Sequence, residues 1–159
     1  MGKPIQLRLL VVELDFQMEG YSTFVNKEKG EIVSVTDRTL RIAEDVEIDM
    51  ENYPEWEQDM IEEAIDIIEN EENFVPIPSQ FDIDEYEIME TFSLNIEPAK
   101  VRERLCRAIQ GRGAFRRFKD LIIELGVADE WYKYKEERLK EIAAEWCKMK
   151  EIDYVDDLE

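Results

Sequence analysis

The spacing of apolar residues changes along the chain, and this change limits the possible folds more than any other feature. β-Branched and aromatic residues dominate residues 21–26 and 32–36, and the connection between them contains Gly30. A glycine suits the positive φ of a short turn, so these runs predict a β-hairpin. Beyond Pro54, apolar residues recur every three or four positions, which is helical spacing. We therefore predict an α+β fold, with a small antiparallel sheet packed against a mostly helical C-terminal half.

Prolines and acidic caps mark the expected helix starts. Pro54 suits the first turn of a helix that runs to about Asn70. Asp82 with Glu85 three residues later resembles a capping box and opens a second helix. The inner face of the first helix is predicted to consist of Trp56, Met60, Ile61, Ala64, Ile65 and Ile68.

The remaining helices are separated by glycines. Pro98 begins a helix that residues 111–113 (Gly-Arg-Gly) break, and a shorter helix follows and stops at Gly126. Asp129 is predicted to cap the last long helix. Its core stripe is expected to be Tyr132, Leu139, Ile142, Trp146 and Met149.

Four segments have weaker patterns. Residues 5–18 have helical spacing, although the run at 9–12 equally fits a buried strand. Residues 40–43 are interpreted as a short strand, and the prolines make residues 74–78 extended. The alternation at residues 152–155 predicts a terminal strand.

The length of 159 residues fits one domain covering residues 1–159. No apolar run approaches the roughly 20 residues of a membrane helix, and the N-terminus lacks the pattern of a signal peptide. Cys106 and Cys147 are isolated from each other and from any metal-binding motif, so we expect two reduced, buried thiols. These features predict a cytoplasmic protein without membrane contact.

The net charge of −20 is unevenly distributed. Residues 1–99 contain 6 basic and 26 acidic residues, whereas residues 100–159 contain 14 of each. The segment 100–119 contains eight basic residues against one acidic residue. A polarised chain of this kind either presents a basic surface or packs its basic segment beside an acidic helix of its own, and the sequence leaves both interpretations open.

The strongest candidate for a binding site is the glycine- and arginine-rich part of this segment. Two glycines allow a tight turn, of which at least one should have a positive φ, and a new helix begins near residue 114 with basic side chains around it. Such a helix start suits an anion. The candidate anion- or partner-binding residues are Gly111, Arg112, Gly113, Arg116, Arg117 and Lys119.

The same residues have a structural interpretation. Their arginines suit capping of helix carbonyls or pairing with nearby acids, and the spacing of Phe115 and Phe118 is that of core residues, although an exposed ring could stack on a base. The aromatic stretch at residues 131–134 (Trp-Tyr-Lys-Tyr) is likewise interpreted as core, with a binding ledge as the alternative.

Catalytic chemistry has little support in the sequence. The chain has no histidine, so histidine-dependent triads and metal sites are excluded. The acidic runs at 45–51 and 82–87 lack the glycine and the spacing of a calcium loop, and we expect no metal or cofactor. An enzyme that uses paired carboxylates is left as the third hypothesis.

Four segments resemble the short bacterial proteins of uncharacterised protein family 0158. They are residues 21–33 (YSTFVNKEKGEIV), 83–92 (IDEYEIMETF), 108–120 (AIQGRGAFRRFKD), and 131–134 (WYKY) with 143–147 (AAEWC). The resemblance covers nearly the whole chain and implies a bacterial, cytoplasmic, single-domain protein without an assigned activity. It transfers no catalytic residue.

We therefore expect a non-enzymatic binding or regulatory protein that uses a basic face (residues 100–119). Its partner would be an acidic protein, a phosphate-bearing ligand, or its own acidic half in a homodimer. RNA or DNA binding through the same face is the alternative, and the overall charge disfavours it.

Overall fold

The computed structural model describes residues 2–80 and 82–157 and has the predicted α+β fold. The chain forms two compact units, which are Met1–Ser79 with Ala143–Glu159 (unit 1) and Gln80–Ile142 (unit 2). Helix α7 (Ala128–Met149) contributes residues to both. The organisation of residues 1–159 as one domain stays a prediction.

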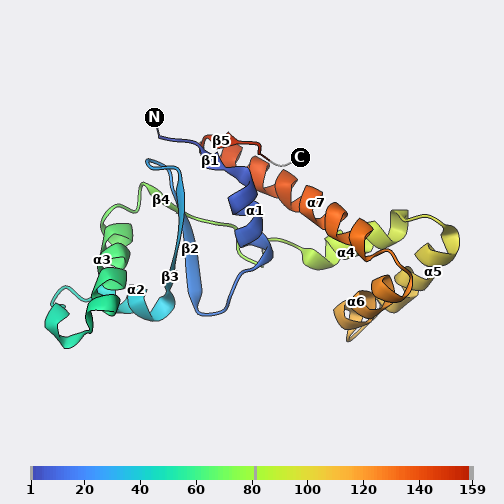
Figure 1. The fold of residues 1–159 in the computed structure, drawn as a ribbon, viewed down its shortest axis with the longest axis horizontal. Helices are drawn as coiled ribbons and strands as arrows, with labels where there is room; N and C mark the ends of the chain where they lie inside the picture. The colour runs from blue at the N-terminus through green and yellow to red at the C-terminus, as the bar shows by residue number, and fades with distance from the viewer. Residues whose placement is uncertain (1, 81, 158–159) are drawn as a thin grey trace. The chain divides into compact units, whose positions relative to one another are not determined.

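Unit 1 contains the strands and the first three α-helices (Figure 1). A three-stranded antiparallel sheet has the order β3-β2-β4, and β1 pairs with β5 in parallel. The elements are β1 (Ile5–Gln6), α1 (Leu7–Asp15), β2 (Tyr21–Asn26), β3 (Glu31–Thr36), α2 (Asp37–Ala43), the 3₁₀ helix η1 (Met50–Asn52), α3 (Glu55–Glu69), β4 (Phe74–Pro76) and β5 (Tyr154–Val155).

The predicted hairpin is confirmed as β2 and β3, with Phe24 opposite Val33. Gly30 has a φ of +66°, and its N–H donates to the carbonyl of Asn26 at 2.9 Å. A Cβ at this position would lie only 2.6 Å from the carbonyl oxygen of Pro4. Both the backbone conformation and the close approach of another segment therefore require glycine.

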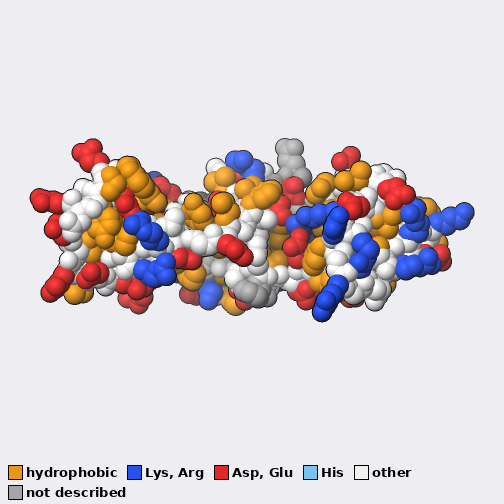
Figure 2. Space-filling view, turned by 90° about the horizontal axis from the view of Figure 1, so that it is seen from below, with side chains coloured by type: hydrophobic (Ala, Val, Ile, Leu, Met, Phe, Trp, Pro, Cys, Tyr) orange, Lys and Arg blue, Asp and Glu red, His pale blue; other side chains and the backbone are white. Residues whose placement is uncertain are grey.

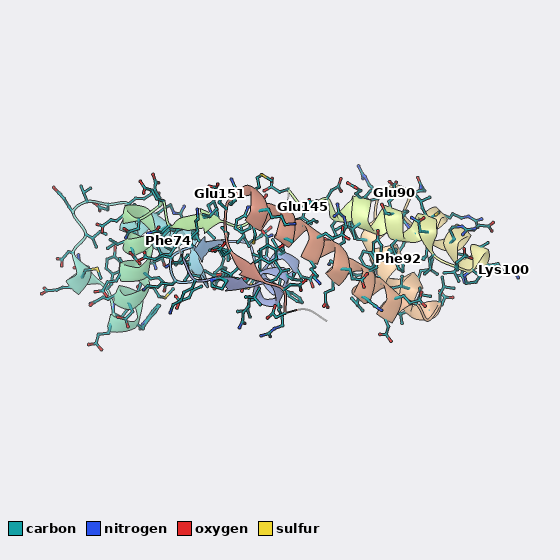
Figure 3. The ribbon with its side chains drawn as sticks, turned by 90° about the horizontal axis from the view of Figure 1, so that it is seen from above. Phe74, Glu90, Phe92, Lys100, Glu145 and Glu151 are labelled. Atoms are coloured by element: carbon teal, nitrogen blue, oxygen red, sulfur yellow. The ribbon has the colours of Figure 1, made fainter. Side chains whose placement is uncertain are left out.

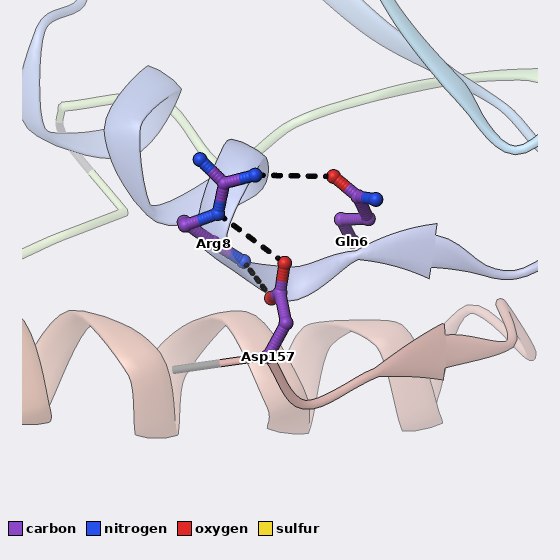
Figure 4. A network of polar contacts seen from close by, with 3 residues as sticks. All are labelled: Gln6, Arg8 and Asp157. Carbon is purple, nitrogen blue, oxygen red and sulfur yellow. Dashed lines mark hydrogen bonds and ion pairs between the residues drawn. The ribbon is translucent and has the colours of Figure 1, made fainter. Parts of the chain in front are cut away.

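Residues 7–15 form a helix, which decides between the two interpretations of this segment. Leu7, Leu10, Val11 and Leu14 are its buried residues. Its N-cap residue Gln6 provides no side-chain cap. Instead the carboxylate of Asp157 accepts hydrogen bonds from the backbone N–H of Arg8 at 2.9 Å and from its Nε at 3.3 Å (Figure 4). The backbone hydrogen bond from Arg8 lowers the pKa of Asp157.

Two expectations for unit 1 are wrong. Residues 40–43 belong to helix α2 rather than a strand, because the hydroxyl of Thr36 caps it by accepting from the Thr39 N–H at 3.0 Å. The buried face of α3 is also rotated from the predicted one, since Trp56 is 66% exposed while Glu57 is buried. The buried residues of α3 are Glu57, Ile61, Ala64 and Ile67.

Glu57 is buried in unit 1 because its carboxylate forms an ion pair with Arg38 of α2. Pairing offsets part of the desolvation cost of the charge. Val35, Ile67 and Phe74 form a core cluster between the sheet and α3; Phe74 is labelled in Figure 3. The apolar spacing of α3 gave no sign that an acidic residue would face inward.

Unit 2 contains three further helices, α4 (Glu85–Asn95), α5 (Ala99–Ala108) and α6 (Ala114–Glu124). Helix α4 starts two residues later than expected, because Asp84 rather than Asp82 accepts the capping hydrogen bond from the Glu87 N–H. Pro98 precedes α5 as predicted.

Aromatic rings hold unit 2 together. Phe92 of α4 lies 5.3 Å from Trp131 and 5.5 Å from Tyr134 of α7, and Phe118 of α6 lies 4.8 Å from Trp131. Trp131 is therefore a core residue, although the predicted stripe of α7 did not include it. The predicted stripe of α7 is wrong at Tyr132 and Met149, which are 59% and 73% exposed.

Both cysteines are free thiols, as expected, and Cys147 is fully buried; the expected burial is wrong for Cys106, which is half-buried. Burial raises the pKa of the Cys147 thiol from 9.0 to about 11.

We expect a thiol reagent to label Cys147 slowly at pH 8 in the folded protein and completely after denaturation. The Cys106→Ser variant isolates this signal and retains a donor to the Ser93 carbonyl. Labelling of Cys147 in the folded protein as fast as in the denatured one would contradict its burial.

The same shift predicts a pH dependence of stability. The folded-state pKa of Cys147 lies above its unfolded value, so its contribution is constant below about pH 9 and is lost as the pH rises toward 11. The free energy of unfolding should fall across this window more steeply in the wild type than in Cys147→Ala. If the free energy of unfolding of the two proteins falls equally with pH across this window, the raised pKa of Cys147 is contradicted.

Candidate functional site

The turn between α5 and α6 positions the candidate residues. Gly111 and Gly113 have φ values of +72° and +77°, which confirms the expectation that glycine geometry is needed here. Gly113 is the N-cap residue of α6 and supplies no side-chain cap. A Cβ on Gly113 would lie 3.0 Å from Nη1 of Arg117. The turn therefore combines a left-handed backbone with close approach of an arginine.

Arg117 binds the backbone of this turn. Its Nε donates to the carbonyl of Ala108 at 2.8 Å, and its two Nη atoms donate to the carbonyls of Gln110 and Arg112. These carbonyls lie at or beyond the end of α5, where no further helical N–H is in place to satisfy them. The guanidinium group of Arg117 thus serves the fold.

Two other arginines of the segment pair with acids of unit 2. Arg102 lies 3.7 Å from Glu97, and Arg104 lies 3.6 Å from Glu124. The second pair joins α5 to α6. Both are long, largely exposed ion pairs, which contribute little to stability.

The five other basic side chains of the segment are exposed, and none has an acidic side chain within 4 Å among the described residues of unit 2. Figure 2 shows basic side chains gathered over α5 and α6, and Figure 3 labels Lys100 near the start of α5. We call these residues the basic face: Lys100, Arg107, Arg112, Arg116 and Lys119.

The two phenylalanines of the segment have different surroundings. Phe118 is buried among the core rings, as its spacing predicts. Phe115 is 41% exposed, so its interpretation as a core residue is wrong; its ring lies edge-on to that of Tyr86, with ring centroids 6.3 Å apart. The hydroxyl of Tyr86 donates to the carbonyl of Ile109 at 2.9 Å, which fixes that ring. An apolar surface therefore accompanies α6 beside its basic residues.

Sequence reasoning missed a cavity of about 530 Å³ in unit 2. One wall comes from the end of α4 and the residues after it, and the other comes from the first turns of α7. The available signal was the spacing of Glu130, Tyr134 and Glu137, which places them on one face of α7. The lining residues are Phe92, Asn95, Ile96, Glu97, Glu130, Lys133, Tyr134 and Glu137.

Two further properties of residues 2–80 and 82–157 bear on the chemistry. No three of their carboxylate or thiol side chains come together as ligands for a metal ion. None of their helices has both the length and the apolar content to cross a bilayer.

The two adjacent arginines of α6 provide a matched test of role. Arg117→Ala removes three hydrogen bonds to backbone carbonyls and should lower the free energy of unfolding by about 1 kcal/mol or more. Arg116→Ala removes an exposed cation without a carboxylate partner in unit 2 and should change it by less than about 0.5 kcal/mol. Urea unfolding followed by circular dichroism measures both. Equal losses would contradict the structural role of Arg117.

Two comparisons with known proteins found the same family. The model of the Uncharacterised protein family (UPF0158) matches residues 3–159. A similar protein is UPF0158 protein PA5073 of Pseudomonas aeruginosa, with 32% identity over 66 residues. That alignment spans 41% of this chain and 43% of the relative, less than half of either. No solved structure matches the chain significantly. The match over residues 3–159 shows that the chain belongs to the uncharacterised protein family UPF0158.

Proposed function

We propose that this chain is a non-enzymatic binding protein of the cytoplasm whose basic face takes an acidic segment of a partner protein. The observation that carries the proposal is the set of five exposed cations on α5, α6 and their turn without acidic partners in unit 2. An incoming carboxylate does not have to displace an acid of unit 2 from these side chains.

The charge distribution supports this choice of surface. Unit 2 contains 12 basic and 14 acidic residues, so it is nearly neutral, whereas unit 1 contains 8 basic and 26 acidic residues. The basic face is thus a local positive region in an acidic protein. Short-range attraction at this face competes with long-range repulsion from the rest of the chain, and the repulsion selects against highly charged partners.

The spread of the cations supports an extended partner over a single small anion. At 1.5 Å per residue, Lys100 and Arg107 lie about 10 Å apart along α5, while Arg112 lies in the turn and Arg116 on α6. Phe115 adds an exposed apolar ring to the same helical hairpin. A peptide with several carboxylates and an apolar side chain matches both features.

Nucleic acid is the second candidate, because the exposed ring of Phe115 suits stacking on a base. The net charge of −20 opposes it, since every approaching phosphate meets the field of the whole chain. Inorganic phosphate is the third probe. It tests whether the face recognises a compact anion instead of an extended one.

The test is a titration of a fluorescent peptide that contains glutamates and one leucine, at low and moderate salt. Arg112→Gln/Arg116→Gln removes two charges from the basic face, and Lys148→Gln/Lys150→Gln removes two exposed charges of unit 1 as the matched control. We expect saturable peptide binding that weakens with salt and falls about fivefold or more in the first variant only.

Single-stranded RNA of equal length and inorganic phosphate are titrated in parallel. Tighter binding of RNA than of the peptide would replace the proposal by nucleic-acid recognition, and binding of phosphate alone would assign the face to a compact anion. Absence of peptide binding at low salt, or an equal loss in both variants, would overturn the proposal.

A further inference from the structure

A second site, separate from the basic face, is formed by the cavity between the end of α4 and the first turns of α7. Its volume of about 530 Å³ lies within the range of pockets that hold small molecules. None of its lining residues belongs to the basic face. We propose that this cavity binds a small organic ammonium ion with an apolar body.

The apolar part of such a ligand matches the apolar lining residues Phe92, Ile96 and Tyr134, which we call the base of the cavity. Phe92, which is labelled in Figure 3, is almost fully buried and makes edge contacts with Phe118 and Trp131. Tyr134 is half-buried, and its ring centroid lies 5.5 Å from that of Phe92. Ile96 adds an aliphatic surface. These side chains offer apolar area that is already positioned by the core of unit 2.

The charged part of the ligand matches the walls. Glu130 and Glu137 flank Tyr134 on α7, and Glu97 approaches from the segment after α4, so carboxylates lie on both walls. Lys133 is the single cation among the lining residues, which leaves the cavity with a net negative charge. Glu97 is only loosely engaged, with 3.7 Å between its carboxylate and Arg102 and an 84% exposed side chain.

Two features other than the carboxylates favour a cation. The cavity lies at the C-terminal end of α4, where the last carbonyls of a helix carry partial negative charge. The faces of aromatic rings such as that of Tyr134 also attract cations. An ammonium group can thus meet carboxylates, helix carbonyls and an aromatic face together, whereas a neutral ligand gains only the apolar contact.

The choice of an organic over an inorganic cation follows from the lining. Hard metal ions prefer six or more oxygen ligands in close coordination, and the described residues include no such cluster. The aromatic and aliphatic base of this cavity offers nothing to a hydrated metal ion. This base contributes to affinity only if the ligand carries an apolar body.

Benzylammonium and its neutral counterpart benzyl alcohol test the proposal, with Mg²⁺ as the inorganic cation. Binding is followed by isothermal titration calorimetry and by the fluorescence of Trp131, whose ring is stacked with Tyr134 at 6.5 Å. We expect saturable binding of benzylammonium with a dissociation constant of about 1 mM and binding of benzyl alcohol that is at least about fivefold weaker.

Variants of α7 locate the site. Glu130→Gln should weaken the binding of benzylammonium about threefold or more. Glu136 is an exposed acid of the same helix outside the cavity, so Glu136→Gln should leave this binding unchanged. Tyr134→Leu should weaken binding, and Tyr134→Phe should retain it because the ring is kept. Circular dichroism of each variant confirms that it is folded.

Three results would overturn the proposal. They are no saturable binding of benzylammonium to the folded wild type, equal binding of benzyl alcohol, and equal effects of Glu130→Gln and Glu136→Gln. If Mg²⁺ at equal concentration fully displaces benzylammonium, the site attracts cations through its acidic charge alone. This result would overturn the role given to the aromatic base.

Discussion

The guanidinium group of Arg117 organises the part of unit 2 on which the candidate site depends. Helix α5 ends with carbonyls that have no helical N–H to bind, and the two glycines that turn the chain have no side chains to satisfy them. Arg117 donates to three carbonyls in and before this turn. A planar group with five donors can satisfy several acceptors at once, which lysine cannot do. The relative direction of α5 and α6 therefore depends on Arg117, which belongs to α6.

This structural use of one arginine changes what the basic segment can do. Its charges divide into one that serves the turn, two that pair with Glu97 and Glu124, and five that form the basic face. The five were not distinguishable from the other three by residue type or by local density of charge. Their availability to a partner follows from the geometry of the hairpin, because that geometry determines which acids each side chain can reach.

The aromatic core explains why unit 2 can have two candidate surfaces of opposite character. Phe92, Phe118 and Trp131 pack α4, α6 and α7 together, and edge-on contacts between rings fix their relative rotation. With these rotations fixed, Glu130 and Glu137 line the cavity. The surface of α6 is basic by contrast. Exposed Phe115 and half-buried Tyr134 show that both surfaces retain aromatic area at the edge of the core.

The sequence by itself determined the fold class, the hairpin at Gly30, the extended segment at 74–78, the starts of the helices at Pro54 and Pro98, and the glycine turn at 111–113. These features depend on local backbone preference, which each residue carries with it. It also located the basic segment. The helix at residues 40–43 also has a local cause, the Thr36 cap, which the interpretation as a strand overlooked. Only the tertiary structure decided that Glu57 is buried and that Trp56 is exposed. A buried carboxylate requires a partner such as Arg38 from another helix, and apolar spacing alone cannot indicate such a partner. The same reason applies to the cavity and to Arg117, since both depend on atoms brought together from separate elements by packing.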